Sequence, residues 1–506
     1  MSQDQTEAID FLSDPANHAG AEVRHVQTHG AHVFLAGPDA YKIKRAVRYD
    51  YLDFSTLPLR HDMLARELEL NRPTAPEIYR DLVPLVRAAD GGLALGGDGE
   101  VVEWVLRMAR FPTEDELSAV TERGDLDDAL AEALGTEVQA YHARAPRRDA
   151  DGAALMAAIV TELEDAFAGM TEDLGPGPVS RFHATARPLL GQLSPLLRDR
   201  AGDGHLRRAH GDLYLNNIVR IGGRPVLFDA LEFDETLGTC DVLYDLAFLV
   251  MDLRHRHLDR AACLTLDAWL FAAGGAEDAG LAALPFFMGI RAAIRAMVEV
   301  QTGRAAGGAA EHAARAREFL DDALAGFAPL PPRLLAIGGL SGTGKTTLAR
   351  DLAPLLAPTP GAVHLRSDLE RKRLAGAAPL EHLPPGAYTP AATRAVYDRL
   401  LGRAETLLGA GRSVLLDATW LAPSERADAE TLAQRAGVPF SALWLEAGTG
   451  TLQDRVAGRR HDASDATQEV VARQALHARV PEHWLRIDAS RSPGDTLLDS
   501  RTALGL

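Results

Sequence analysis

The chain has 506 residues, enough for about three folding units, and its 46% apolar and 25% charged residues are ordinary for a globular protein. The net charge of −18 is uneven, because the first 330 residues hold 32 basic and 52 acidic side chains whereas residues 331–506 hold 21 and 19. This acidity excludes a long nucleic-acid track in the first part, since phosphate contacts need Arg and Lys, and it fits either general solubility or a cationic small-molecule acceptor.

Two further observations concern the compartment in which the chain works. The first ten residues, MSQDQTEAID, are acidic without an apolar core, and no run approaches the roughly 18 apolar residues that span a bilayer. Cys240 and Cys263 are the only cysteines, too few for a disulfide framework or a zinc site of their own. We therefore expect a cytoplasmic protein with no membrane partner.

The first strands carry a candidate phosphate-binding lysine. Short apolar runs predict strands at residues 23–28, 32–36 and 40–44. The turn Thr28–Ala31 is expected to lie over nucleotide phosphates. A period of two puts Ala40 and Lys42 on one face, which suits a small residue under adenine and an ammonium near the α- and β-phosphates. Lys44 shares this face and is the second choice.

The following helix supplies a partner for that lysine. Residues 59–71 have helical spacing, and we predict that Glu67 holds Lys42 in place, with Glu69 as the fallback. The competing interpretation is that Glu67 only faces solvent. A strand at 101–108 ends this β-rich part, and helical patterns follow.

The middle of the chain holds the residues suited to catalysis. His210-Gly211-Asp212 is followed five residues later by Asn217, and Asp229 ends an apolar run. Phosphoryl transfer from ATP needs a carboxylate beside the attacking hydroxyl and oxygen ligands for Mg²⁺. Asp212 suits the first task, as the base, and Asn217 and Asp229 suit the second. An ordinary hairpin rich in Asp and Asn is the alternative, but the order and spacing, with Asp245 downstream, favour catalysis.

These motifs resemble the kinase catalytic loop and its metal-binding aspartate. The glycine after His210 resembles the aminoglycoside phosphotransferase branch of that fold. Asp245 matches a further aspartate of the branch, which we interpret as structural.

A Pro-rich joint at 327–333 precedes the second strong motif. The buried strand 334–338 leads into Gly339–Thr346, which matches G-x-x-x-x-G-K-[ST] in full and opens a helix. Lys345 is predicted to reach the β- and γ-phosphates, and Thr346 to bind Mg²⁺, while backbone N–H groups wrap the phosphates. The predicted nucleotide-binding residues here are Gly339, Ser341, Gly342, Thr343, Gly344, Lys345, Thr346 and Thr347.

Alternating strands and helices continue to the end of the chain. Strands are predicted at 363–366, 413–416, around Trp444 and at 485–487, so the sheet should be mostly parallel. Asp417 directly follows the predicted strand 413–416, the third strand of this region, and is predicted to bind the same metal ion as Thr346. Arg455 and Arg459 belong to a predicted lid that closes on the transferring phosphate.

The region from about 333 to 506 resembles the small P-loop kinases grouped with polynucleotide 5′-hydroxyl kinases, gluconate kinases and zeta-type toxins. The resemblance implies that Asp368 is a general base, that Arg371 contacts the acceptor, and that Arg459 or Arg460 is the lid arginine. A solvated helix face is the alternative for the basic run 371–373.

The chain as a whole resembles proteins that fuse an aminoglycoside phosphotransferase-like domain to an AAA-type or P-loop ATP-binding domain. The expected fold is an α+β bilobal kinase-like domain followed by an α/β P-loop domain. The expected boundaries are 1–110 for the small lobe, 111–328 for the large lobe and 333–506 for the P-loop kinase domain.

The leading functional prediction is an enzyme with two ATP sites that also use Mg²⁺. The first site would phosphorylate a hydroxyl on a small polyhydroxylated or cationic acceptor. The alternatives are a polynucleotide 5′-hydroxyl kinase, with nucleic acid bound only through the second domain, and an ATP-driven regulatory or toxin-like factor acting on a partner. The sequence predicts neither the acceptor nor the oligomeric state.

Overall fold

The computed structural model describes residues 4–49, 52–306, 308–328, 330–459 and 462–506. It divides into two compact units. The first unit comprises Met1–Ala150 and Ala201–Leu249, and the second comprises Asp151–Arg200 and Val250–Leu506.

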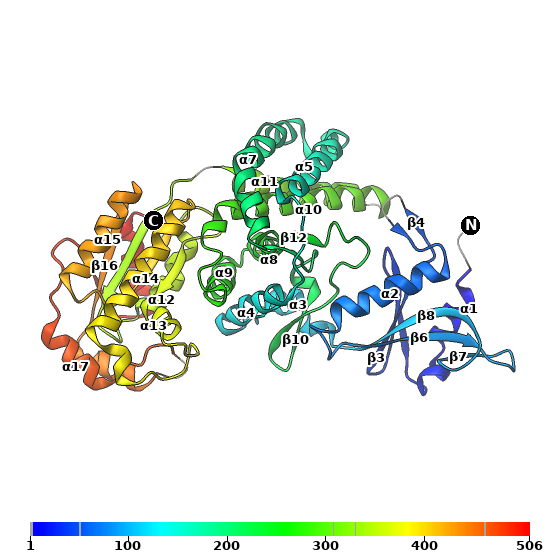
Figure 1. Ribbon diagram of the computed structural model, residues 1–506, viewed down its shortest axis with the longest axis horizontal. Helices are drawn as coiled ribbons and strands as arrows, with labels where there is room; N and C mark the ends of the chain where they lie inside the picture. The colour runs from blue at the N-terminus through cyan, green and yellow to red at the C-terminus, as the bar shows by residue number, and fades with distance from the viewer. Residues whose placement is uncertain (1–3, 50–51, 307, 329, 460–461) are drawn as a thin grey trace. The chain divides into compact units, whose positions relative to one another are not determined.

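A six-stranded antiparallel sheet forms the start of the first unit, in the order β1-β2-β3-β8-β6-β7. Helix α2 (Leu57–Asn71) packs against the sheet, where Leu64 meets Ile78 and Leu106 in a buried cluster (Figure 1). The strands are β1 (Val23–Gln27), β2 (Ala31–Ala36), β3 (Asp39–Lys44), β6 (Tyr79–Arg87), β7 (Leu93–Leu95) and β8 (Glu100–Ala109). Helix α1 (Thr6–Ser13), the 3₁₀ turn Pro15–His18 and the short pair β4 (Arg48–Tyr49) and β5 (Leu52–Asp53) complete this part.

The remainder of the first unit positions the catalytic motifs. The hairpin of β10 (Ile218–Ile221) and β11 (Arg224–Leu227) buries Val219 and Val226 in the same cluster as Leu64. The hairpin therefore ends immediately before Asp229, against the helix and sheet that carry Glu67 and Lys42. The other elements are the 3₁₀ turn Thr113–Asp115, α3 (Leu117–Glu122), α4 (Asp128–Arg144), β9 (Leu206–Arg208), the 3₁₀ turn Leu215–Asn217, β12 (Thr239–Asp241) and the start of α8 (Val242–His255).

The second unit begins with helices. Its members are α5 (Gly152–Ala168), α6 (Thr171–Leu174), α7 (Pro176–Gly202), α9 (Asp259–Ala273), the 3₁₀ turn Ala279–Ala283, α10 (Leu284–Ala306) and α11 (Ala309–Phe327). By length and mean hydropathy alone, one stretch of the described chain, Ala279–Ala305, meets the criterion for a membrane span. Its most apolar window has a mean hydropathy of 1.6 and is 67% buried inside the protein.

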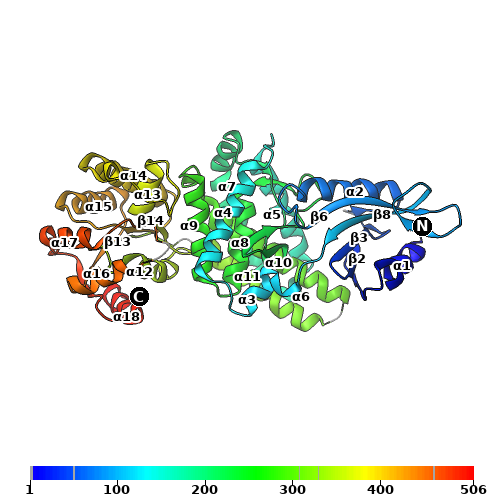
Figure 2. The ribbon, with the colours of Figure 1, turned by 90° about the horizontal axis from the view of Figure 1, so that it is seen from below.

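The second unit ends in a five-stranded sheet with the order β14-β15-β13-β16-β17, and every pairing is parallel. Helices α13, α14 and α15 lie on one side, and α12 and α18 on the other (Figure 2). The strands are β13 (Leu334–Gly339), β14 (Val363–Arg366), β15 (Val414–Asp417), β16 (Phe440–Glu446) and β17 (Leu485–Asp488). The helices are α12 (Lys345–Leu352), α13 (Ser367–Leu374), α14 (Pro390–Gly409), α15 (Pro423–Ala436), α16 (Thr449–Ala457), α17 (Gln468–His477) and α18 (Pro493–Leu504), with 3₁₀ turns at Ala353–Leu355 and Pro385–Tyr388.

The predicted fold class is confirmed. An α+β part with an antiparallel sheet precedes an α/β part with a parallel sheet, and the apolar runs predicted as strands in both parts are strands. The sequence had not indicated β6, which lies between β8 and β7. Its run YRDLVPLVR contains Pro84, which normally argues against an inner strand.

Candidate active sites

A buried carboxylate shapes the loop that carries the predicted base, Asp212. Asp245 is fully buried and accepts hydrogen bonds from the backbone N–H groups of His210 (3.0 Å) and Gly211 (2.9 Å). His142 Nε2 lies 3.1 Å from the same carboxylate. Gly211 has φ +82°, a conformation that glycine adopts without strain. These contacts turn the chain so that Asp212 follows a fixed bend, which supports the structural role predicted for Asp245.

Asp212 and Asn217 lie side by side across this loop. The Asn217 amide Nδ2 donates to the Asp212 carboxylate (2.8 Å) and to its backbone carbonyl (2.9 Å). The Asn217 carbonyl accepts from the Phe228 N–H at 3.0 Å, and His210 Nε2 lies 2.9 Å from the Phe228 carbonyl. Both ends of the loop are thereby tied to the residue before Asp229, so the three predicted catalytic residues are brought together.

Lys42 connects the sheet to this loop. Its Nζ lies 2.7 Å from Glu67 Oε1 and 3.0 Å from Asp229 Oδ1. Burial acts to lower the pKa of Lys42, but the charges of Asp229 and Glu67 outweigh it and hold the pKa well above its usual range. Burial likewise acts to raise the pKa of Asp229, and Lys42 and Lys44 outweigh it, so that pKa is lowered. The ammonium and the carboxylate are therefore both charged near neutral pH.

Lys44 is engaged as well, through the same glutamate. Its Nζ lies 2.7 Å from Glu67 Oε2 and 2.5 Å from Glu232 Oε1. Glu67 is fully buried, so the interpretation that it only faces solvent is wrong. Glu69, the fallback, is exposed and pairs with Arg66. The sequence did not indicate that Glu232 would pair with Lys44.

The P-loop has the backbone that its glycines permit. Gly339, Gly342 and Gly344 have φ values of +136°, +92° and +89°. A Cβ on Gly339 would lie 2.6 Å from the Leu445 carbonyl oxygen, and one on Gly342 would lie 2.8 Å from that of Leu452. The loop thus approaches neighbouring backbone too closely for a side chain. It opens directly into α12, whose N-terminus favours an anion.

Side chains at the P-loop are held by nearby backbone and by the next strand. Lys345 Nζ donates to the carbonyls of Gly339 and Leu340, each at 3.0 Å. Burial lowers the pKa of Lys345, although Asp417 and Asp368 act to raise it. Thr346 Oγ1 donates to Asp417 Oδ2 at 2.6 Å, as expected for a pair that shares a metal site.

Asp417 is held in its charged form. Burial acts to raise its pKa, but the hydrogen bond and charge of His364 (3.3 Å) and the charges of Lys345 and Arg366 hold that pKa well below its usual range. His364 had not been indicated by the sequence, because its partner lies 53 residues away. Burial lowers the pKa of His364, although the hydrogen bond to Asp417 and the charge of that carboxylate act to raise it.

The metal-ligand chemistry of both sites fits Mg²⁺. Mg²⁺ is usually held by one or two protein oxygens together with substrate phosphates. Asn217 with Asp229, and Thr346 with Asp417, each offer such a pair. Within the residues that the structure describes, no three His, Cys, Asp or Glu side chains gather as a closed metal site.

Helix α13 carries the residues predicted to bind the acceptor. Asp368 lies in its first turn. Arg371 donates to the Ala387 carbonyl (2.7 Å) and lies 4.9 Å from the centre of the Tyr388 ring. Lys372 is 1% exposed and its Nζ lies 2.6 Å from Asp465, so a solvated helix face is the wrong interpretation for this residue. The Lys372–Asp465 pair ties α13 to the segment that follows the predicted lid.

The predicted lid arginines lie on or just after α16. Arg455 donates to the Ala489 carbonyl (2.8 Å) and lines a cavity of about 250 Å³ with Thr343, Gly344 and Thr347. Arg459 Nε lies 3.6 Å from Asp462 Oδ2. Arg460, the alternative lid arginine, lies outside the described residues.

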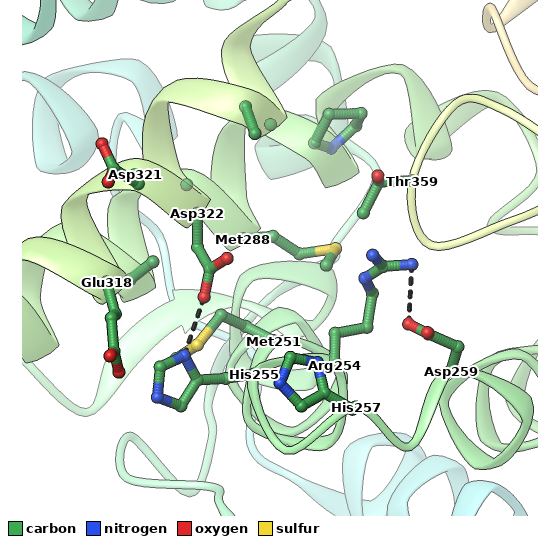
Figure 3. Close-up of a pocket in the computed structure, with 15 residues that line it drawn as sticks. Met251, Arg254, His255, His257, Asp259, Met288, Glu318, Asp321, Asp322 and Thr359 are labelled. Atoms are coloured by element: carbon green, nitrogen blue, oxygen red, sulfur yellow. Dashed lines mark hydrogen bonds and ion pairs between the residues drawn. The ribbon is translucent and has the colours of Figure 1, made fainter. Parts of the chain in front are cut away.

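Another cavity, of about 610 Å³, lies among the helices of the second unit (Figure 3). Met251 and Met288 contribute apolar walls, and two ion pairs, Arg254–Asp259 (3.0 Å) and His255–Asp322 (2.7 Å), lie at its edge. The described residues that line it include none predicted for either ATP site.

Parts of the chain are similar to known proteins. Residues 334–481 match the family model described as an AAA domain. The amicoumacin kinase hAmiN, solved with AMP-PNP, Ca²⁺ and Ami, is similar at 13% identity over 64% of this chain and 93% of its own, with a TM-score of 0.41. The APS kinase CysC of Mycobacterium tuberculosis, solved with AMPPNP and APS, is similar at 21% identity over 35% of this chain and 100% of its own, with a TM-score of 0.27.

A much longer match comes from another protein of Mycobacterium tuberculosis, named "Uncharacterized protein Rv2004c". It is 31% identical over 462 residues, covering 90% of this chain and 89% of the relative. The chain therefore belongs to the family of Rv2004c, and its residues 334–481 form an AAA domain.

Proposed function

We propose that the chain is a cytoplasmic phosphotransferase with two separate ATP sites. The first would transfer the γ-phosphoryl group of ATP to a hydroxyl on a small polyhydroxylated or cationic acceptor. The second would be a P-loop kinase site with its own acceptor. The observation that carries the proposal is the Lys42 ammonium, which lies 2.7 Å from Glu67 and 3.0 Å from Asp229 beside the Asp212–Asn217 loop.

At the first site, Asp212 would orient the attacking hydroxyl and accept its proton as the bond to phosphorus forms. Lys42 would exchange its contact with Asp229 for the α- and β-phosphates, while Glu67 keeps the ammonium in place. Asn217 and Asp229 would hold Mg²⁺, which neutralises charge on the phosphates. The acidic first 330 residues support a cationic or polyhydroxylated acceptor.

At the second site, the P-loop N–H groups and Lys345 would bind the phosphates, and Thr346 and Asp417 would hold Mg²⁺. Asp368 would act as the base and Arg371 would contact the acceptor. The placement of both residues on the single helix α13 supports this assignment.

The test is a nucleotide-consumption screen of the full chain against aminoglycosides, sugars, nucleosides and 5′-hydroxyl oligonucleotides. Asp212→Asn should abolish transfer at the first site, by at least about 100-fold, and leave ATP consumption at the second site unchanged. Asp368→Asn should do the reverse. Loss of both activities in either single variant, with the fold intact by circular dichroism, would contradict two separate sites. Transfer to oligonucleotides that depends on Asp368 would favour the 5′-hydroxyl kinase alternative.

A further inference from the structure

A buried ion network holds α13 through Glu370. Arg403, on α14, donates from Nε and Nη2 to the two carboxylate oxygens of Asp278, each at 2.8 Å. Its third nitrogen, Nη1, donates to Glu370 Oε1 at 2.6 Å. Asp278 and Glu370 are 2% and 1% exposed, and Arg403 is 7% exposed. One planar guanidinium therefore joins two carboxylates with almost no access for water.

The two carboxylates come from distant parts of the chain. Asp278 belongs to the segment Gly274–Asp278 that follows α9, whereas Glu370 lies on α13. Arg399 adds a second connection, since it donates to Glu370 Oε2 (2.6 Å) and to the Gly274 carbonyl (2.9 Å). The guanidinium of Arg373, also on α13, lies 4.2 Å from the centre of the Phe271 ring. The end of α9 and the segment after it thus contact α13 at several points.

The helix geometry connects this network to the second site. Asp368 and Arg371 are three residues apart and share one face of α13, while Glu370 and Arg373 share another. Rotation or displacement of the helix would move both faces together. The ion network on one face therefore sets the position of Asp368 on the other.

We propose that Asp278 is a positioning residue for the second site, acting through Arg403 and Glu370 to hold α13 with Asp368 beside the γ-phosphate. The inference rests on the proposed function of that site. Under this proposal the segment Gly274–Asp278 contributes to the P-loop kinase site, although it precedes the P-loop region by more than fifty residues.

The neighbouring Glu277 supplies a matched control. It lies in the same segment and is also buried at 7% exposed, but its carboxylate pairs with Arg200 of α7 at 2.8 Å. Glu277→Gln and Asp278→Asn therefore remove one buried charge each from adjacent positions. Asp278 is the one whose carboxylate pairs with Arg403, the residue that also holds Glu370 of α13.

The first measurement is hydrogen exchange of the full-length protein. Asp278→Asn should raise the exchange of the α13 amides by about 10-fold or more and leave the α12 amides unchanged, because a weakened ion network lets α13 open locally. Glu277→Gln should leave α13 at the wild-type rate. Unchanged α13 exchange in Asp278→Asn, or an equal rise in Glu277→Gln, would overturn the proposal.

The second measurement uses water as the acceptor. In an Asp212→Asn background, Asp278→Asn should lower the kcat of ATP hydrolysis by about 10-fold and leave the KM for ATP within about twofold, since the P-loop itself is untouched. Equal changes in kcat and KM would indicate a general structural defect and would overturn the positioning role. If Asp278→Asn fails to fold, Glu370→Gln serves instead, because it keeps the size and an acceptor oxygen.

The two proposals can fail separately. If Lys345→Met abolishes hydrolysis while Asp278→Asn changes neither α13 exchange nor kcat, the kinase assignment stands and the positioning role is wrong. If the wild type shows no hydrolysis that depends on Lys345, the kinase assignment fails, and the exchange experiment still decides whether Asp278 holds α13.

Discussion

The two proposed ATP sites differ in the groups that would bind phosphate. The first relies on side-chain charges, with Glu67 shared between Lys42 and Lys44, and Asp229 and Glu232 at the two ends. The second relies on backbone conformation at three glycines with positive φ, and Lys345 donates to the backbone carbonyls of Gly339 and Leu340. The first site should therefore be sensitive to the loss of a charge, and the second to the gain of a side chain.

The largest effect is expected from Glu67→Ala. It leaves two buried ammonium groups without their shared carboxylate, and breaking a buried ion pair typically costs about 3–5 kcal/mol. Hydrogen exchange of the β3 amides should show this loss in the first unit only. Glu69→Ala is the control, because Glu69 is 68% exposed and should change stability by less than about 0.5 kcal/mol. A loss below about 1 kcal/mol for Glu67→Ala would mean that the charges are not what holds the first site together.

The next effect is expected at the P-loop. Gly342→Ala places a Cβ 2.8 Å from the Leu452 carbonyl oxygen at φ +92°, a strain of about 1–3 kcal/mol. The protection of α12 amides by ATP should then need about 10- to 100-fold more nucleotide. Gly344→Ala is the matched variant, because its φ is +89° but no heavy atom lies within 4 Å of the added Cβ. If the two variants lose equal affinity, the close backbone approach is not the cause.

A smaller effect is expected at the second metal site. Asp417→Asn removes the charge beside Thr346 and should raise the Mg²⁺ concentration for half-maximal ATP turnover by about 10-fold or more. The titration is made in the Asp212→Asn background, so that only the second site turns over. Mg²⁺ dependence of the first site, measured with Asp417→Asn alone, should not change. An unchanged Mg²⁺ requirement at the second site would remove Asp417 from the metal site.

The smallest effect concerns pH and the first unit. Burial, followed by the charges of His25 and Arg45, lowers the pKa of His32 from 6.5 to about 4. Between these values the unfolded chain binds a proton that the folded strand does not, so stability falls as pH drops below 6.5 and levels off below about 4. Exchange of the β2 amides, corrected for intrinsic rates, should show this slope, and His32→Gln should flatten it. An identical slope in the variant would assign the effect to other groups.

The sequence predicted the features that depend on neighbouring residues. Alternation along 40–44 placed Lys42 correctly toward Glu67, and the strand–loop–helix pattern located the P-loop with its lysine. The P-loop motif lies within a few residues of the strand and the helix that flank it. The Lys42–Glu67 pair needs only one strand and the next long helix to be predicted correctly.

The features that escaped prediction depend on distant partners. Lys372 looked like part of a solvated basic run because Asp465, which pairs with it, lies 93 residues away. Glu232 was missed because its role appears only when Lys44 is brought beside it from 188 residues away. Strand β6 was missed because Pro84 argues locally against a strand, whereas its pairing with β8 and β7 is a property of the whole sheet.

The scarcity of lysine has a practical consequence for handling this protein. The chain has four lysines, and Lys42, Lys44 and Lys372 are held in ion pairs while Lys345 contacts the P-loop carbonyls. Amine-directed dyes, surface-coupling reagents and lysine cross-linkers would therefore find few exposed side-chain amines. A reagent that does react with one of these lysine side chains will break an ion pair or a P-loop contact, so immobilisation is better made through an engineered tag.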